Sequence, residues 1–549
     1  MTNEVEQIEE KPSHFKKTLT YEDLTNKQKE FVDLVLTGVN VNLIGAAGSG
    51  KTAALRVALE MKLARGDFTP VAFTTKAFRN QTDLNCTFGT FTRRATKPLR
   101  AAVPEALKHL VSTFHNLTEY SPVGYEVTGA GGEVRNLRRF EPQRNKLNTL
   151  PPLNLLVGDE AGQIGLTLWS SVTNALADFS STQIILLGDL FQLPPVQDSP
   201  VLGYSLAKNK TVVLDKVHRQ AEESPIIRFA DRVLSGERFT DEELDTEWKT
   251  YRPWVNILRV KPTETAQATS LAFFGSNNGK TKSVLHAALD SGEYNPFLDV
   301  ILTAQNYEAL GQSTINAHIA SMLDAKLPDD FKAKYPLTRI MAGRAKLLFR
   351  VGDKVLFNGE DYYITDIEEN PHYMSAKGID TSVYDRFGRT LEKHALELPS
   401  GALMRSALDK SGDGLLDYFE QAMQEEESKS AASHKLTLTY YEDGVAVAKQ
   451  FISQKTELDS IQLGYCITGH KSQGSQWRNV YVVCHQVHAK TLTREWLYTT
   501  CTRPTEKLYI LGTTVGINKA IARKAIKGET VEEKIEVFKQ KTNFDKVMV

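Results

Sequence analysis

The chain has 549 residues, which is too long for one compact core and enough for about three or four domains. Hydrophobic residues make up 41% and charged residues 24%, the composition of an ordinary globular protein and not of a disordered or membrane-embedded one. The formal net charge is −1. Attraction to a polyanion would therefore have to come from local basic patches.

The N-terminal segment and the cysteines indicate an intracellular protein. Residues 1–20 are polar and lack the apolar core of a signal peptide, so we expect a disordered lead-in. No apolar run reaches the length of a membrane span. The cysteines contain no C-x-x-C pair, and we expect them to be reduced and buried without a zinc site; they are Cys86, Cys466, Cys484 and Cys501. We expect a cytoplasmic protein with no membrane partner, in a bacterial host if the gene is phage-encoded.

A glycine-rich loop predicts a nucleotide site early in the chain. Residues 42–52, NLIGAAGSGKT, fit the spacing G-x-x-x-x-G-K-[ST], after a buried strand and before an amphipathic helix that ends at Gly66. The glycines let backbone N–H groups face a phosphate at a helix N-terminus, and a lysine adds positive charge. The hydroxyl of Thr52 can ligate Mg²⁺. The predicted nucleotide-binding residues of this loop are Gly45, Gly48, Gly50, Lys51 and Thr52.

Two further apolar strands end in polar residues. LNLLVGDEAG (153–162) ends with Asp159 and Glu160, and TQIILLGDLFQLPPV (182–196) carries Asp189 and Gln192. The carboxyl ends of parallel strands meet at one edge of a sheet, so these side chains are expected in one crevice. There Asp159 is predicted to hold Mg²⁺ and Glu160 to orient the attacking water. Gln192 either senses the γ-phosphate or caps the Leu-Pro-Pro turn, and the residues alone leave both open.

Later segments predict β-structure and a polar loop. Residues 124–140 alternate on both sides of a glycine-rich turn and predict a β-hairpin. Residues 348–368 predict short strands joined by Gly-Asp and Asn-Gly turns. From Thr513 onward, Lys and Glu alternate at helical spacing, which predicts a helix that packs on the protein or on a partner.

Residues 409–420, DKSGDGLLDYFE, fit the spacing of a calcium-binding EF-hand loop. EF-hands usually occur in pairs and the sequence has no second loop, so we favour a helical hairpin with a glycine-rich turn. Ca²⁺ binding is kept as the alternative, with the ligands Asp409, Ser411, Asp413, Asp417 and Glu420.

The order of motifs resembles the superfamily 1 helicases, and among them the RecD-like and phage Dda-like branch, superfamily 1B. The resemblance covers most of residues 20–512 and rests on the P-loop, DEAG, GDLFQLPPV, VHRQ, ITGHKSQGSQW and LYTTCTRPTEKLYIL. It implies an α/β fold of two RecA-like P-loop motor domains with ATP between them. A small β-hairpin insert would lie in the first domain and an SH3-like β-barrel insert in the second.

The resemblance also implies domain bounds. After the lead-in at 1–20, the first motor domain would span 21–215, with a wedge-hairpin subdomain at about 92–150. The second motor domain would combine 216–345 and 461–512, interrupted by the SH3-like insert with its EF-hand-like element at 346–460. Residues 513–549 would form a C-terminal helical tail.

Further site residues follow from matching family positions. Gln28 would lie against the adenine, Gln473 and Gly474 near the nucleotide, and Arg219 and Arg503 at the γ-phosphate. The positions expected near the bound DNA strand are Thr75, Thr468, His470 and, on the hairpin, Arg138 and Arg139. An ordinary solvated hairpin and surface salt bridges are the alternatives for the hairpin and the two arginines. The chain departs from the family pattern at Gly89, Gly162, Gln476 and Pro504.

The function implied by the resemblance is that of an ATP-dependent DNA helicase that uses Mg²⁺, moves 5′ to 3′ on single-stranded DNA and unwinds duplexes. Its partners would be single-stranded DNA and duplex junctions, with single-strand-binding or replication proteins as candidates. Two alternatives stay open. One is an RNA-directed helicase of the same fold, and the other is a DNA-binding regulatory ATPase that switches conformation without unwinding.

Overall fold

The computed structural model describes most of the chain as two compact units. The described residues are 19–67, 86–128, 134–195, 198–214, 224–243, 255–259, 265–275, 283–342, 345–357, 360–371, 373, 431–442, 445–458 and 460–541. Unit 1 comprises residues 1–237, 494–502 and 524–549, and unit 2 comprises 238–493 and 503–523. Two late segments of the chain therefore belong to the first unit.

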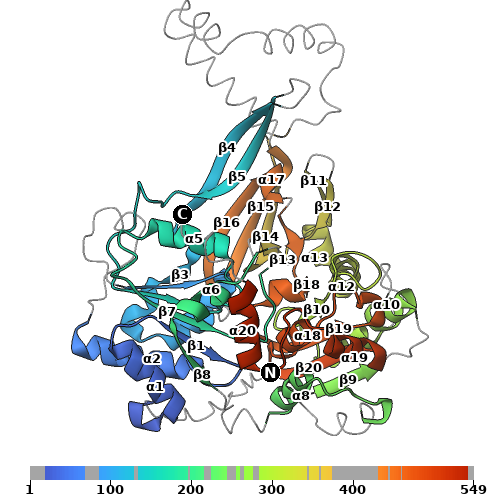
Figure 1. The fold of residues 1–549 in the computed structure, drawn as a ribbon. Helices are drawn as coiled ribbons and strands as arrows, with labels where there is room; N and C mark the ends of the chain where they lie inside the picture. The colour runs from blue at the N-terminus through green and yellow to red at the C-terminus, as the bar shows by residue number, and fades with distance from the viewer. Residues whose placement is uncertain are drawn as a thin grey trace, which may run out of the picture. The chain divides into compact units, whose positions relative to one another are not determined.

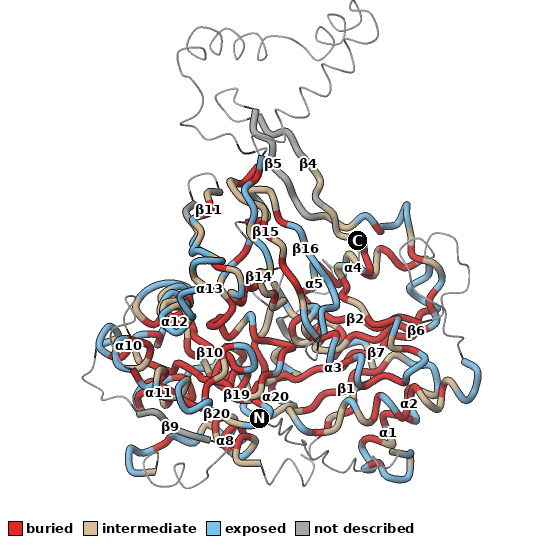
Figure 2. The backbone as a smooth tube through the Cα atoms, turned by 180° about the vertical axis from the view of Figure 1, so that it is seen from behind, coloured by how far each residue is buried: buried red, intermediate tan, exposed pale blue. Residues whose placement is uncertain are grey.

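Unit 1 is built on a six-stranded parallel sheet with the order β3-β2-β6-β7-β1-β8 (Figure 1). Every residue of β1, β2, β6 and β7 is buried, and Figure 2 shows these strands in red. The three strands predicted before the P-loop, before DEAG and before GDLFQ are confirmed. The strands are β1 (Val41–Gly45), β2 (Cys86–Thr90), β3 (Val111–Thr113), β6 (Leu155–Gly158), β7 (Gln183–Gly188) and β8 (Lys210–Leu214).

Helices cover this sheet. The predicted P-loop helix is confirmed: it is α2, it begins after Gly50 and it ends at Gly66, and both glycines are left-handed, with φ of 82° and 72°. Helix α1 packs against α2 and β8, and α20 packs against α6. The helices are α1 (Asn26–Leu36), α2 (Lys51–Arg65), α3 (Arg93–Ala102), α4 (Phe114–Leu117), α5 (Leu166–Ala175), α6 (Val201–Lys208), α8 (Pro225–Ser235), α18 (Arg494–Cys501) and α20 (Val531–Lys541).

The predicted hairpin is confirmed. Strands β4 (Tyr120–Thr128) and β5 (Val134–Pro142) pair antiparallel along their whole length. In this register Arg138 pairs with Gly124 and Arg139 with Val123. The turn that joins the strands, at residues 129–133, lies outside the described residues.

Unit 2 contains a five-stranded parallel sheet with the order β18-β10-β19-β20-β9. Together with the sheet of unit 1, it gives the chain two parallel α/β sheets, as expected for two RecA-like domains. The strands are β9 (Val255–Arg259), β10 (Val300–Thr303), β18 (Cys466–Thr468), β19 (Trp477–Cys484) and β20 (Pro504–Gly512), and the helices are α10 (Ala266–Phe274), α11 (Val284–Asp290), α12 (Gln312–Lys326), α13 (Asp329–Lys334) and α19 (Thr514–Ala522).

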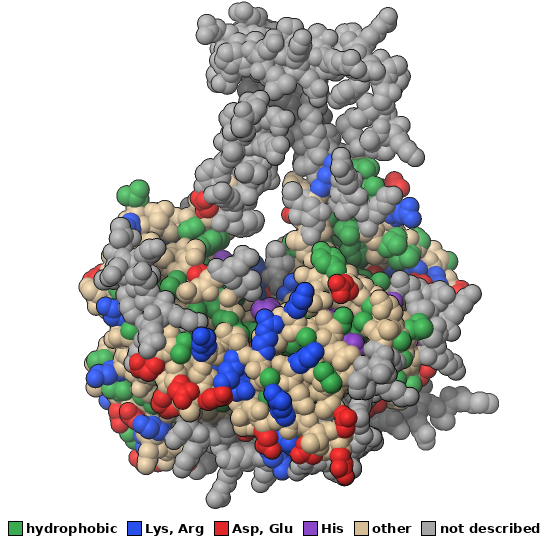
Figure 3. All heavy atoms as spheres, turned by 45° about the vertical axis from the view of Figure 1, so that its right-hand side comes forward, with side chains coloured by type: hydrophobic (Ala, Val, Ile, Leu, Met, Phe, Trp, Pro, Cys, Tyr) green, Lys and Arg blue, Asp and Glu red, His purple; other side chains and the backbone are tan. Residues whose placement is uncertain are grey.

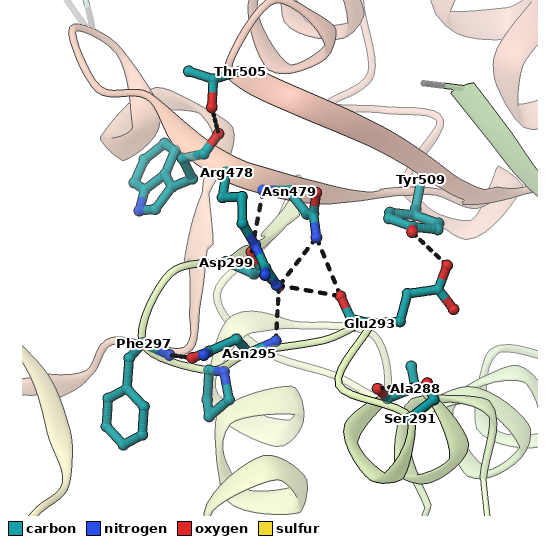
Figure 4. Close-up of polar contacts among 12 residues, drawn as sticks. Ala288, Ser291, Glu293, Asn295, Phe297, Asp299, Arg478, Asn479, Thr505 and Tyr509 are labelled. Atoms are coloured by element: carbon teal, nitrogen blue, oxygen red, sulfur yellow. Dashed lines mark hydrogen bonds and ion pairs between the residues drawn. The ribbon is translucent and has the colours of Figure 1, made fainter. Parts of the chain in front are cut away.

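A buried carboxylate ties two strands of this sheet together at their amino ends. Asp299, just before β10, accepts two hydrogen bonds from Arg478, Nε to Oδ1 at 2.9 Å and Nη2 to Oδ2 at 2.7 Å (Figure 4). The backbone N–H groups of Asn479 and Asn295 also donate to it, at 3.1 and 2.7 Å. A buried charge is stable only when it is satisfied in this way. This ion pair lies at the amino ends of the strands. In parallel α/β sheets, ligands bind at the opposite edge, at the carboxyl ends.

The insert in unit 2 is antiparallel. Five strands pair in the order β16-β15-β14-β13-β17, and β11 pairs with β12. The predicted β-strands are present, whereas an SH3-like barrel and the predicted domain bounds stay predictions. Residues 409–420 lie outside the described residues. The elements are β11 (Thr338–Ala342), β12 (Ala345–Phe349), β13 (Lys354–Phe357), β14 (Glu360–Glu369), β15 (Ala431–Glu442), β16 (Val445–Gln454), α17 (Lys455–Leu458) and β17 (Gln462–Leu463).

The cysteines and the surface charges agree with the expectations from the composition. All four cysteines are buried and free, as predicted. Lys and Arg as well as Asp and Glu side chains occur on the face shown in Figure 3, in keeping with a net charge near zero. Within the described ranges, each helix is too short or too polar to cross a bilayer.

Candidate nucleotide site

A pocket of about 480 Å³ opens over the P-loop of unit 1, beside the first turns of α2 and the end of α3. Gly48 and Gly50 have φ of 78° and 82°, a region that favours glycine. A Cβ at Gly45 would lie 2.4 Å from Ser49 Oγ, so a larger residue there would displace the Ser49 hydroxyl. The first turn of α2 lines the pocket, and its backbone N–H groups and dipole favour an anion. Lining residues include Gly48, Ser49, Gly50, Lys51, Thr52, Arg56 and Ala101.

Two side chains hold the P-loop in shape. Lys51 Nζ donates to the carbonyl oxygens of Gly45 at 2.7 Å and Ala46 at 3.1 Å, which keeps the ammonium on the loop. Gln28 is buried; its Nε2 donates to Gly50 O at 3.2 Å, and its Oε1 accepts the N–H of Thr25 at 2.9 Å. Gln28 thus joins the start of α1 to the P-loop. Its predicted contact with adenine stays a prediction.

The two carboxylates predicted for Mg²⁺ and water follow β6 in the same unit. Burial and the neighbouring charge of Glu160 raise the pKa of Asp159 to about 6, while the charge of Lys51 acts to lower it. Two adjacent carboxylates in a poorly solvated place repel each other, and a divalent cation would relieve that repulsion. Asp159 directly follows β6 and Thr52 is exposed in the first turn of α2, and their predicted role as Mg²⁺ ligands stays a prediction.

Glu160 is held in an unusual conformation. Its φ is 52°, in the left-handed region that costs a non-glycine residue about 1 kcal/mol or more. Gln163 is buried, and its Nε2 donates to Glu160 Oε2 at 3.2 Å, while its backbone N–H bonds Glu160 O at 2.9 Å. The strained backbone and this amide together fix where the Glu160 carboxylate points. Gln163 could not be predicted from the sequence, where its position directly after DEAG is the one feature that distinguishes it.

We expect Gln163→Ala to lower kcat for ATP hydrolysis by about tenfold, because loss of one hydrogen bond frees the Glu160 carboxylate to leave its position. The affinity for nucleotide should hardly change, since Gln163 is absent from the residues that line the pocket. Steady-state kinetics and nucleotide titration measure the two effects. Gln143→Ala, which alters an exposed amide of unit 1, is the control. An unchanged kcat in a folded Gln163→Ala variant would exclude the positioning role.

A tyrosine of α18 links the P-loop to the turn after β7. Tyr498 OH donates to Asp189 Oδ2 at 2.8 Å and accepts the N–H of Ala47 at 2.9 Å. The other oxygen of Asp189 accepts the N–H of Phe191 at 2.9 Å. Tyr498 lies in the motif LYTTCTRPTEKLYIL, but the sequence pattern indicates no role for it. Only the fold shows that α18 reaches the P-loop.

Gln192 lies in the same turn and is buried. Within the part of the chain that the structure describes, its Oε1 has no hydrogen-bond partner. An unsatisfied buried acceptor is costly, so Gln192 is suited to meet a ligand or its water. Both predicted roles, sensing the γ-phosphate and capping the turn, stay open.

The predicted residues of unit 2 cluster after β18. Thr468 ends this strand, and His470 lies in the short 3-10 helix Gly469–Ser472 that follows. Burial lowers the pKa of His470, which favours the neutral ring at pH 7. Its predicted contact with the bound DNA strand stays a prediction. Gln473 is buried, and Gly474 is left-handed with φ of 74°.

Arg503 is buried at the start of β20, and its Nη1 donates to Ser475 O at 3.5 Å. Unit 2 therefore brings Arg503 next to the loop that carries Gln473 and Gly474. Thr75 and Arg219 lie outside the described residues, and Arg138 and Arg139 are described in backbone only. A search of the described ranges finds no group of three or more His, Cys, Asp or Glu side chains arranged to hold a metal.

Comparison with known proteins finds two domain families in the chain. The AAA domain family matches residues 23–247, and the UvrD-like helicase C-terminal domain family matches residues 463–511. The ATP-dependent RecD2 DNA helicase of Deinococcus radiodurans is 26% identical over 402 residues, which are 72% of this chain and 42% of the relative. The chain thus spans less than half the length of this relative.

Two further similarities are more limited. The RecD subunit of the RecBCD enzyme of Mycobacterium tuberculosis is 35% identical over 79 residues, 14% of each chain. The crystal structure of Pif1 helicase from Candida albicans covers 94% of this chain and 99% of its own, with 14% identity and a TM-score of 0.45.

The domain matches and the RecD2 relative agree with the motifs in the sequence. Both matched domains occur in the order that the motifs predict, and the P-loop, Asp159 and Glu160 lie within the first of them. The alignment with the RecD2 helicase extends over most of the chain. The chain therefore combines an AAA domain with a UvrD-like helicase C-terminal domain, and both matches support its resemblance to the superfamily 1B helicases of the RecD type.

Proposed function

We propose that the protein is an ATP-dependent DNA helicase that moves 5′ to 3′ on single-stranded DNA and unwinds duplexes. The observation that carries the proposal is the P-loop pocket of unit 1, which Lys51 and Thr52 line, in a unit that also carries Asp159 and Glu160 directly after β6. The chain continues into a UvrD-like helicase domain. The description of the Deinococcus radiodurans relative as a DNA helicase supports the choice of DNA, and the RecD-type family supports the direction.

In this proposal the triphosphate lies against the first turn of α2. The backbone N–H groups of the P-loop and the ammonium of Lys51 would bind its phosphates, with the ammonium exchanging its two carbonyl partners for phosphate oxygens. Thr52 and Asp159 would hold Mg²⁺, which neutralises charge on the phosphates when bound. Gln28 would keep the loop in the shape that fits the phosphates, and contact with adenine is its second proposed role.

Hydrolysis needs an oriented water and positive charge at the γ-phosphate. Glu160, fixed by Gln163, would orient the water. Arg219 and Arg503 would stabilise the charge that develops on the transferring phosphoryl group, and Gln192 would sense whether that group is present. An arginine supplied by the second unit would make hydrolysis depend on domain closure, which is how ATP turnover would become movement along DNA.

On DNA, Thr75, Thr468 and His470 would contact the bound strand. Stacking and backbone contacts do not read sequence, so the grip would be independent of sequence. The hairpin β4–β5, with Arg138 and Arg139, would block the partner strand at the junction. Breaking one base-pair step costs roughly 1.4 kcal/mol, so a motor that advances about one base for each ATP needs little force at each step.

The RNA-directed alternative is tested by the nucleic acid that stimulates hydrolysis. We expect single-stranded DNA to raise ATP turnover well above that with RNA of the same sequence, measured at matched ionic strength because backbone binding is salt-dependent. Stronger stimulation by RNA would favour the RNA-directed helicase. The regulatory alternative would hydrolyse ATP without releasing the partner strand of a duplex, so strand displacement separates it from a helicase.

Three narrower proposals accompany this function. For residues 409–420 we propose the helical-hairpin turn, with Ca²⁺ binding as the alternative that calorimetric titration distinguishes. Single-strand-binding or replication proteins are proposed as partners. The cytoplasm is the proposed location, supported by four buried cysteines that form no disulfide.

A further inference from the structure

Helix α20, near the C-terminus, carries a lysine, Lys534, that is buried in unit 1. Lys534 is 2% exposed, and its Nζ lies 3.2 Å from Glu495 Oε1 and 3.2 Å from the carbonyl oxygen of Ile526. Glu495, on α18, is 1% exposed and also accepts the backbone N–H groups of Ala525 at 2.7 Å and Ile526 at 3.3 Å. Neither matched domain family reaches this segment, since they end at residues 247 and 511.

The same ammonium lies against the turn that follows β7. Lys534 Nζ is 5.3 Å from the centroid of the Phe191 ring, within the range of a cation–π contact. The Phe191 ring meets the Tyr498 ring edge-on, with centroids 6.4 Å apart at 69°. Phe191 also donates its N–H to Asp189, whose other oxygen receives the Tyr498 hydroxyl that binds the P-loop.

A continuous set of contacts therefore runs from α20 to the P-loop. It passes through one buried ion pair, two rings and one carboxylate, all within unit 1. If the ammonium of Lys534 lay at the surface, water would solvate it and it would need none of these partners. Burial of a lysine ammonium is costly unless its charge is paired and its N–H groups are bonded. Besides the carbonyl oxygen of Ile526, the contacts of Lys534 reach α18 through Glu495 and the 189–192 turn through Phe191.

We propose that Lys534 is a positioning residue for ATP hydrolysis, which fixes helix α18 through Glu495 and the 189–192 turn through the Phe191 ring. In this proposal the C-terminal helix α20 contributes to ATP hydrolysis by unit 1. The inference rests on the proposed ATPase function. Because Lys534 does not line the nucleotide pocket, its loss should lower kcat and leave KM for ATP nearly unchanged.

The test uses the full chain with both members of the ion pair changed together. In Glu495→Gln/Lys534→Met no buried charge is left unpaired, although the glutamine oxygen can accept only one of the two backbone N–H groups, which bond different oxygens of Glu495. We expect some loss of thermal stability from that hydrogen bond. Measured at a temperature where the variant is fully folded, kcat for DNA-stimulated ATP hydrolysis should fall roughly fivefold to tenfold, with KM changed less than about twofold. Lys527→Met, which alters an exposed lysine of the same segment, is the control with wild-type kinetics.

A second variant keeps the ion pair and removes the ring. Phe191→Leu should lower kcat to a similar degree, and adding it to the paired variant should cause little further loss, because both act through one contact. If the paired variant does not fold, Phe191→Leu decides: a lowered kcat supports the role and a wild-type kcat overturns it. A folded paired variant with wild-type kcat would show that the ion pair only stabilises the fold. No DNA-stimulated hydrolysis by the wild type would instead overturn the proposed function.

Discussion

Lys51→Ala is expected to reduce ATP turnover by at least about a hundredfold, because it removes the positive charge predicted to meet the β- and γ-phosphates. The fold should survive. In the structure the Lys51 ammonium bonds two carbonyl oxygens of its own loop, at 2.7 and 3.1 Å, and these can bond water instead. DNA-stimulated ATP hydrolysis, measured beside thermal unfolding, separates loss of chemistry from loss of structure.

A matched control lies at the other end of the same helix. Arg65→Ala removes an exposed cation at the end of α2, far from its first turn, and should leave turnover near the wild-type rate. Near-normal hydrolysis by a folded Lys51→Ala variant would show that the P-loop pocket is not where ATP is hydrolysed.

For Arg503→Ala we expect kcat to fall by a factor on the order of 10³, with a much smaller change in nucleotide affinity. A guanidinium at the γ-phosphate stabilises charge that develops only in the transition state, so its loss affects turnover more than binding. Arg503 is buried beside Ser475 O, so thermal unfolding must be measured for each variant.

The lysine variant sharpens this test. Arg503→Lys keeps a positive charge but loses the planar fork, and should recover only part of the lost turnover. Single-turnover kinetics and equilibrium nucleotide titration measure chemistry and affinity separately. A raised KM with wild-type kcat in Arg503→Ala would assign the residue to nucleotide binding and remove its role in the transition state.

Local patterns predicted most of the elements that surround the site. The strands β1, β6 and β7 are largely apolar runs, and glycines in the sequence, Gly50 and Gly66, mark both ends of helix α2. The hairpin β4–β5 follows from alternation around a glycine-rich turn. Such signals depend on neighbours a few residues apart, which is why they can be read without the fold.

The contacts that support the site could not be predicted in this way. Tyr498 meets Asp189 and Ala47 across more than 300 residues of sequence, and Lys534 meets Phe191 across a similar distance. A predicted packing helix near the C-terminus gave no indication of which residues it would meet. Gln28 was predicted from its motif, but its bonds to the P-loop backbone are visible only in the folded unit.

The most direct test of the proposed helicase is strand displacement on two DNA duplexes that differ only in having a 5′ or a 3′ single-stranded tail. Each is incubated with the wild-type protein and with Lys51→Ala, with and without ATP. The account predicts that only the wild type releases a strand, only with ATP, and only from the 5′-tailed duplex. Release solely from the 3′-tailed duplex would contradict the predicted direction, and ATP hydrolysis with no release from either duplex would contradict the helicase function itself.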